Sequence, residues 1–188
     1  MSSFTWVLAL AVLASGAAPS DSPPAAGTLR GQPFKAAAAE LRVLGLNSVK
    51  VAGKVEDRAQ AYLLEFKDRD VFMADNTIQV WFAVDVGQPL DNLRLDCRPV
   101  EFGTEAYRKQ HYRPGRGSVA RGITGVFATV KRGGSSDTAM VGDNIAATLR
   151  FGKASNGWIA GVIDLQLSKE HKTVFRGSFR ARIEKFGN

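Results

Sequence analysis

The strongest constraint on the fold is an alternation of apolar and polar side chains with a period of two residues. It is clearest in the segment Ile78–Val86, where every second residue, starting with Ile78, is a large apolar one. The same alternation recurs in the segments 62–66, 93–97, 123–131, 145–151, 158–167 and 174–183. A strand with one apolar face has to pack against a second layer. The chain is therefore expected to form an all-β domain.

The last two of these segments predict a hairpin with a defined register. If the chain folds back about Glu170, Gly161 lies opposite Phe179, and the glycine leaves room for the ring. On the other face, Asp164 lies opposite Arg176, and their charges are complementary. The remaining pairs are Leu165 with Phe175, Ile163 with Gly177, and Trp158 with Arg182, the last within reach of a cation–π contact.

Turn signals separate the strands, among them Asn156-Gly157 and the segments 133–136 and 142–144. Eight or nine short strands joined in this way predict a single antiparallel β-sandwich. A closed antiparallel β-barrel is the alternative. The sandwich is favoured because the irregular stretch Pro99–Gly122 suits a crossover between two sheets better than a hairpin loop. The segment Ala36–Leu44 stays ambiguous, since its alanines favour helix and its neighbours favour strand.

Glycine-rich patterns at both ends of the domain carry a resemblance. They are Gly27-x-x-x-Gly31-x-Pro33-Phe34, Gly161-x-Ile163-x-Leu165-x-Leu167 and Arg176-Gly177-x-Phe179-x-Ala181. Together they resemble a family of secreted bacterial β-sandwich domains of unknown function. The resemblance implies the sandwich fold and export. It implies no activity and no functional residue.

The first residues predict a secretory signal peptide. An apolar run from Trp6 to Ala14 is followed by small residues, and the run is too short to cross a membrane as a helix. We expect the signal peptide to span residues 1–17, a flexible Pro/Ala/Ser linker to span 18–26, and the β domain to span 27–188. The expected location is therefore secreted or periplasmic, in the cell envelope.

The chain is basic and has a single cysteine. Its 25 Lys and Arg residues outnumber its 18 Asp and Glu residues, which gives a formal net charge of +7. Such a surface attracts polyanions. Cys97 has no second cysteine to pair with, so the fold has to depend on its core. It shares a strand face with Leu93 and Leu95, which predicts a buried thiol.

The most distinctive polar feature is a basic stretch between Tyr107 and Gly122. Arginine can clamp a phosphate or carboxylate with two hydrogen bonds, and tyrosine can stack on a ring. We therefore predict a ligand-binding site made of Arg108, Lys109, His111, Tyr112, Arg113, Arg116 and Arg121. A second basic set is expected on the outer face of the last strand, at Arg176, Arg180 and Arg182. The other interpretation of the stretch is a solvated crossover whose arginines protect a sheet edge.

No pattern in the chain indicates an active site or a cofactor. His111 is the better of two candidate bases, and Ser118 lacks the glycine that a nucleophile elbow needs at position 120. The His, Cys and carboxylate residues lack the close spacing of a zinc site. The acidic segment Asp68–Asn76 lacks the glycine of a calcium loop. We therefore predict no catalytic residue, no metal site and no cofactor.

The predicted function is that of an exported, non-catalytic binding or structural module of the cell envelope. Its basic loop would engage an anionic envelope polymer, a lipid head group or a protein, and nucleic acid is less favoured. One alternative is an extracellular hydrolase with a site in residues 107–122 and His111 as the base. Another is a barrel that carries an apolar small molecule, with Trp81 or Trp158 near its mouth. No transmembrane segment is expected after signal cleavage.

Overall fold

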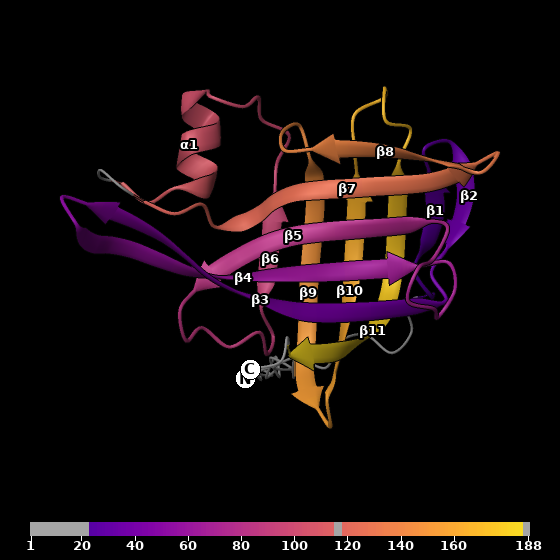
Figure 1. Cartoon of the computed structure of the whole chain (residues 1–188), viewed down its shortest axis with the longest axis horizontal. Coiled ribbons are helices and arrows are strands. Elements are labelled where there is room, and N and C mark those ends of the chain that lie inside the picture. Colours follow the sequence, from indigo (N-terminus) through magenta and orange to yellow (C-terminus); the bar gives the residue numbers. More distant parts are fainter. Residues whose placement is uncertain (1–22, 115–117, 186–188) are drawn as a thin grey trace, which may run out of the picture.

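The computed structural model describes residues 23–114 and 118–185 (Figure 1). Within them the chain forms eleven β-strands and the short helix α1 (Glu105–His111). The strands are β1 (Ala26–Leu29), β2 (Gln32–Lys35), β3 (Ala38–Val51), β4 (Lys54–Lys67), β5 (Thr77–Asp85), β6 (Arg94–Cys97), β7 (Gly122–Arg132), β8 (Ser135–Val141), β9 (Ala146–Ser155), β10 (Trp158–Gln166) and β11 (Val174–Lys185). The expectation of a mostly β chain is confirmed.

The strands belong to one continuous, open sheet. Its order is β6-β9-β10-β11-β3-β4-β5-β7-β8, with β1 paired to β11 and β2 paired to β1. The closed barrel is therefore wrong, because β6 and β8 stand at opposite ends of the described sheet and do not pair. A single sandwich of eight or nine strands is not confirmed either. The predicted number of strands is lower than the eleven observed. Strands β1 and β2 have only four residues each, too few to show an alternation.

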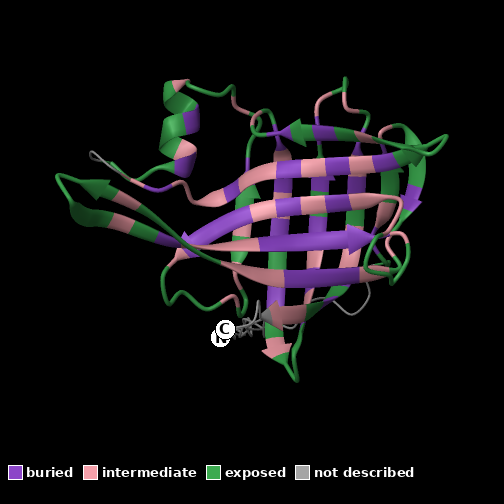
Figure 2. Ribbon diagram, in the orientation of Figure 1, coloured by how far each residue is buried: buried purple, intermediate pink, exposed green. Residues whose placement is uncertain are grey.

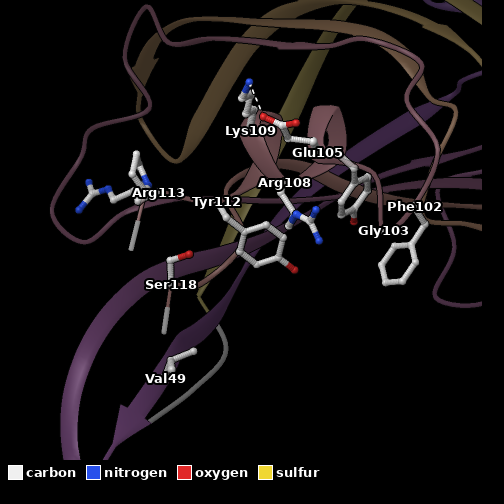
Figure 3. Close-up of a pocket in the computed structure, with 11 residues that line it drawn as sticks. Val49, Phe102, Gly103, Glu105, Arg108, Lys109, Tyr112, Arg113 and Ser118 are labelled. Atoms are coloured by element: carbon white, nitrogen blue, oxygen red, sulfur yellow. Dashed lines mark ion pairs between the residues drawn. The ribbon is translucent and has the colours of Figure 1, made fainter. Parts of the chain in front are cut away.

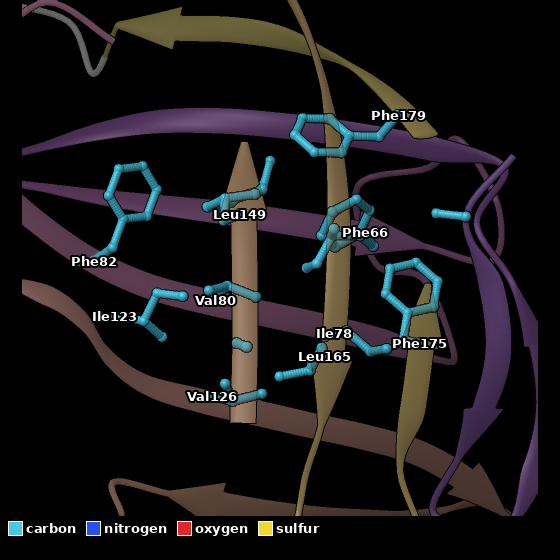
Figure 4. Close-up of a cluster of buried hydrophobic side chains, with 14 of the residues drawn as sticks. Phe66, Ile78, Val80, Phe82, Ile123, Val126, Leu149, Leu165, Phe175 and Phe179 are labelled. Atoms are coloured by element: carbon cyan, nitrogen blue, oxygen red, sulfur yellow. The ribbon is translucent and has the colours of Figure 1, made fainter. Parts of the chain in front are cut away.

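The sheet bends so that two layers lie face to face. In Figure 1, β3, β4, β5, β7 and β8 run across the view, and β6, β9, β10 and β11 lie behind them in a crossing direction. Buried positions alternate along the strands of both layers (Figure 2). Between the layers the core is filled with rings and aliphatic chains (Figure 4), and Phe66 packs edge-on against Phe175 and Phe179 with centroids 4.9 and 5.4 Å apart.

A short parallel pairing joins the two layers. Strand β11 pairs with β3 over its last four residues, and all other described strand pairs are antiparallel. Beside this joint, Glu40 lies directly opposite Glu65, and like charges in this position repel. Two cations offset the repulsion. Lys67 Nζ is 2.7 Å from Glu40, and Arg42 Nη2 is 2.7 Å from Glu40 and 2.9 Å from Glu65.

Arg182 extends this network onto β11. Its guanidinium is 3.2 Å from Glu40 and 3.0 Å from Glu184. Lys67 is only 2% exposed and Glu40 only 5%, so each of these charges has lost most of its water and depends on its partners. The network therefore ties β11 to β3 and β4 at the point where the two layers meet.

The register predicted for the C-terminal hairpin is confirmed in every pair. Gly161 lies opposite Phe179, and Asp164 Oδ1 is 2.7 Å from Arg176 Nε. The turn Asn156-Gly157 before it is also confirmed. Both of its residues have positive φ, 52° and 76°, which is the conformation that two-residue hairpin turns favour.

The cation–π contact of this hairpin differs from the prediction. Arg180, and not Arg182, lies over the Trp158 ring, with its guanidinium carbon 4.7 Å from the ring centroid. Arg182 does lie directly opposite Trp158, but its guanidinium turns to Glu40 and Glu184. A buried carboxylate attracts a guanidinium more strongly than an indole ring does.

Two segments that the sequence left irregular or ambiguous have regular structure. Most of Ala36–Leu44 belongs to β3, because β4 pairs with it and β11 pairs with part of it, which outweighs the helical preference of alanine. The stretch Pro99–Gly122 leads from β6 to β7 in the other layer, as a crossover does, and contains α1. At the other end of the chain, Ala25 is buried and Ala26 begins β1, so these last linker residues pack against the domain.

Replacing Gly161 by alanine should destabilise the hairpin. A Cβ at this position would lie 2.4 Å from Phe179 Cζ and 2.5 Å from the backbone oxygen of Arg150. We expect Gly161→Ala to lower the free energy of unfolding by about 2 kcal/mol, as overpacked cores do, in urea denaturation. Gly142→Ala is the matched control, because nothing lies within 4 Å of the added methyl group. Equal stabilities of the two variants would contradict the account.

The ion network at the layer joint should make stability depend on pH. Burial raises the pKa of Glu40, but hydrogen bonds from Lys67 and Arg42 lower it by more, so the pKa lies below its usual value. Glu40 therefore stabilises the fold above the pKa of an unfolded Glu, about 4.3, and this stabilisation is lost as the pH falls towards the lower folded pKa. We expect Glu40→Gln to cost about 3 kcal/mol at pH 7 and to flatten the pH dependence of urea unfolding below pH 4.3. The exposed Glu170→Gln should leave the curve as it is in the wild type, and a wild-type curve for Glu40→Gln would refute the role of Glu40.

Candidate functional site

An arginine anchors the basic stretch to the sheet. Arg121 lies just before β7 and donates two hydrogen bonds of 2.7 Å to the two oxygens of Asp57 in β4, and its Nε is 2.5 Å from Asp85 in β5. The backbone N–H of Val119 adds a bond of 2.7 Å to Asp57. These hydrogen bonds, first of all those from Arg121, hold the pKa of Asp57 well below its usual range. The guanidinium N–H groups of Arg121 thus donate their hydrogen bonds to carboxylates within the protein.

His111 fastens the end of helix α1 to the same arginine. Its Nδ1 is 3.0 Å from the carbonyl oxygen of Arg121, and its Nε2 is 3.1 Å from the amide nitrogen of Gln110. A carbonyl can only accept, so Nδ1 carries the proton and Nε2 accepts from Gln110. The ring is buried and packs 4.5 Å from the ring of Tyr107. Both ring nitrogens are therefore engaged within the protein.

Helix α1 forms because its first turn is capped. The Thr104 side chain accepts a hydrogen bond of 3.2 Å from the backbone N–H of Tyr107, and Glu105 places a negative charge in the first turn. Glu105 also pairs with Lys109 one turn later, at 2.7 Å. Tyr107 is buried and packs 5.1 Å from the Phe102 ring. The helix therefore packs against the domain through Tyr107, and the charged side chains of Glu105 and Lys109 face solvent.

Gln110 of the helix also donates a hydrogen bond to the single cysteine, Cys97. Its amide nitrogen is 3.2 Å from Cys97 Sγ. Cys97 is buried, as its place in the alternation predicted. Burial raises the pKa of this thiol to about 11, although the hydrogen bond from Gln110 lowers it slightly. Cys97 is therefore a packed core residue and holds almost no thiolate at neutral pH.

A cleft of about 770 Å³ opens in front of the helix. One wall is α1 with the residues next to it, and Val49 lies on the opposite side, in the β3–β4 ribbon (residues 46–58), which extends beyond the body of the sheet in Figure 1. Aromatic and apolar side chains provide much of the lining. The lining residues are Val49, Phe102, Gly103, Glu105, Tyr107, Arg108, Lys109, Tyr112, Arg113, Pro114 and Ser118 (Figure 3).

Three cations line the cleft, and two of them have carboxylate partners. Lys109 pairs with Glu105, and Arg113 pairs with Asp85. Within the described part of the chain, the guanidinium of Arg108 makes no ion pair or hydrogen bond. In Figure 3 it projects between the rings of Tyr112 and Phe102. Arg108 is thus the uncompensated charge of the cleft.

The structure brings together some of the predicted site residues and separates the others. Those that line the cleft are Arg108, Lys109, Tyr112 and Arg113. His111 and Arg121 lie outside its described lining and form the anchor. Arg116 lies outside the described residues. The second basic set, on β11, lies apart from α1 in Figure 1, and its members bind Asp164, Trp158 and Glu40.

Sequence reasoning missed the apolar side chains that line the cleft from outside the stretch between Tyr107 and Gly122. Phe102 is 69% exposed, in the turn that precedes α1, and Val49 comes from β3. A large aromatic residue outside any alternating segment could have indicated Phe102 as a surface ring. Nothing in the sequence indicates Val49, because it reaches the cleft only through the length of the ribbon.

The described residues contain neither a metal-binding cluster nor a membrane-spanning helix. Across 23–114 and 118–185, no three His, Cys, Asp or Glu side chains gather closely enough to hold a metal ion. In the same part of the chain, no helix has the length and apolar character needed to span a membrane.

No family model, curated protein or solved structure matches this chain. The resemblance to secreted β-sandwich domains therefore stays a prediction. What the cleft can do has to be argued from its own residues.

The anchor should depend on the planar fork of Arg121. Lysine keeps the charge but cannot make the paired hydrogen bonds to Asp57, so a poorly solvated carboxylate would lose a partner. We expect Arg121→Lys to lower the free energy of unfolding by about 2 kcal/mol in urea. Arg113→Lys is the matched control, because this exposed pair with Asp85 should contribute less than about 1 kcal/mol. A larger loss in Arg113→Lys than in Arg121→Lys would contradict the anchor.

Proposed function

We propose that the protein is an exported, non-catalytic binding module of the cell envelope and that it holds an anionic ligand in the cleft between α1 and the β3–β4 ribbon. The observation that carries this proposal is Arg108. It stands between exposed aromatic rings, and no described carboxylate pairs with it. The signal peptide predicted from the first residues supports export. The two crossing layers are compatible with the sandwich class that the resemblance implies.

The cleft suits a ligand with one anionic group on an apolar or aromatic body. Glu105 offsets Lys109, and Asp85 offsets Arg113, so among the described lining residues a single positive charge remains to bind a carboxylate, phosphate or sulfonate. The rings of Tyr112 and Phe102, 37% and 69% exposed, offer faces for stacking. A lipid head group with its first methylene groups or an aromatic acid has this chemistry, and a long polyanion would need more free cations.

The two alternative functions find less support. A hydrolase that uses His111 as its base needs a free ring nitrogen near the substrate, and both nitrogens of His111 are engaged away from the cleft. A carrier of an apolar molecule needs a lumen. The space between the layers is instead crossed by packed rings such as Phe66, Phe82 and Phe151.

Binding of an aromatic sulfonate tests the proposal. The probe is 1-anilinonaphthalene-8-sulfonate, whose fluorescence rises when it enters an apolar site. We expect Arg108→Ser to weaken its binding about tenfold, the effect of roughly one charge-assisted hydrogen bond. Tyr112→Ala should weaken it by a similar factor, and added salt should weaken binding to the wild type.

The matched control is Arg150→Ser. Arg150 is also an exposed arginine without a described ion pair, but it lies in β9 and does not line the cleft. Its replacement should leave the affinity unchanged. If the combined replacement of Arg108, Arg113 and Arg116 by serine left full binding, the proposal would be wrong.

A further inference from the structure

Strand β8 is an open edge without the usual protection. The described sheet ends at β6 and at β8. Strand β6 has four residues and is followed by Pro99, so it offers little to another strand. Strand β8 has seven residues, Ser-Ser-Asp-Thr-Ala-Met-Val, with no Lys, Arg or Pro. Its single charge, Asp137, is paired with Arg30 at 2.8 Å. Backbone groups on the side away from β7 are thus free to pair with another strand.

A row of apolar side chains leads to this edge on the outer face of the sheet. Trp81 of β5 packs 5.8 Å from Phe127 of β7, and Phe127 lies directly opposite Met140 of β8. Met140 is 74% exposed. An apolar row that ends in an exposed methionine at an unpaired edge gains contacts if the sheet continues.

We propose that β8 pairs with β8 of a second copy of this chain, in antiparallel fashion and about a two-fold axis at Thr138. In this register all seven residues of each strand find a partner, and Thr138 faces Thr138 of the second copy. Met140 then faces Ser136 of the second copy, and Asp137 faces Ala139. No like charges stand opposite each other. The two open sheets become one continuous sheet across the dimer.

The ends of the strands are also complementary in charge. Arg132 precedes β8 in the sequence and has no described ion pair, whereas Lys131 is already paired with Asp75; Asp143 follows the strand. Antiparallel pairing brings the start of one β8 next to the end of the other. Arg132 of each copy therefore approaches Asp143 of the second copy, twice by symmetry. This complementarity favours a second copy over an unrelated strand as the occupant of the edge.

Sedimentation equilibrium of the purified protein tests the proposal. The weight-average mass should rise with concentration towards twice the monomer mass. Met140→Lys places a charge at the edge, the device by which natural sheets prevent such pairing, and should weaken the dimer at least tenfold. Met73→Lys is the matched control, because this methionine is 79% exposed in the β4–β5 loop and its replacement should leave the dimer intact.

Cross-linking gives a second readout that does not depend on the stability of a variant edge. Residues opposite each other in an antiparallel pair have Cα atoms about 4.5–5.5 Å apart, within reach of a disulfide. In a Cys97→Ala background, Thr138→Cys should oxidise to a covalent dimer, and Ser155→Cys, exposed in the other layer, should stay monomeric. A wild-type protein that remains monomeric up to about 0.5 mM would overturn the proposal and leave the edge to an extended segment of a different protein.

Discussion

The parallel pairing of β11 with β3 is the constraint on which the rest of the fold depends. It extends over only four residue pairs, yet it connects the strands of one layer to those of the other. Glu40, Glu65, Lys67 and Arg42 form a buried network beside it. Buried charges contribute little net stability compared with apolar residues, but a misplaced partner is costly. The network therefore favours this one alignment of the two layers over shifted ones.

The cleft follows from a second set of charges used in the same way. Arg121 binds Asp57 and Asp85, so the stretch after α1 is held against β4 and β5. Asp85 also takes the charge of Arg113. The anchor thus neutralises Arg121 and Arg113, Glu105 neutralises Lys109, and Arg108 is left without a described partner. The proposed ligand therefore carries a single anionic group and is not a polyanion.

The sequence predicted what depends on nearby residues and missed what depends on distant ones. The hairpin of β10 and β11 was predictable in every pair, because the sizes of Gly161 and Phe179 and the charges of Asp164 and Arg176 determine its register. The open sheet was not predictable, because closure depends on whether β6 meets β8, and no local pattern reports that. Asp57, the partner of Arg121, lies 64 residues earlier in the chain. The sequence therefore indicates a cation at this position but not the carboxylate that neutralises it.

The most direct test of the central claim is a crystal structure of the protein with 1-anilinonaphthalene-8-sulfonate bound. We expect the sulfonate to lie within hydrogen-bond distance of the Arg108 guanidinium, about 2.7–3.2 Å, and the naphthalene ring to lie between Phe102 and Tyr112. A probe bound on the outer face of a layer, or a probe in the cleft with Arg108 turned away from the sulfonate, would contradict the central claim.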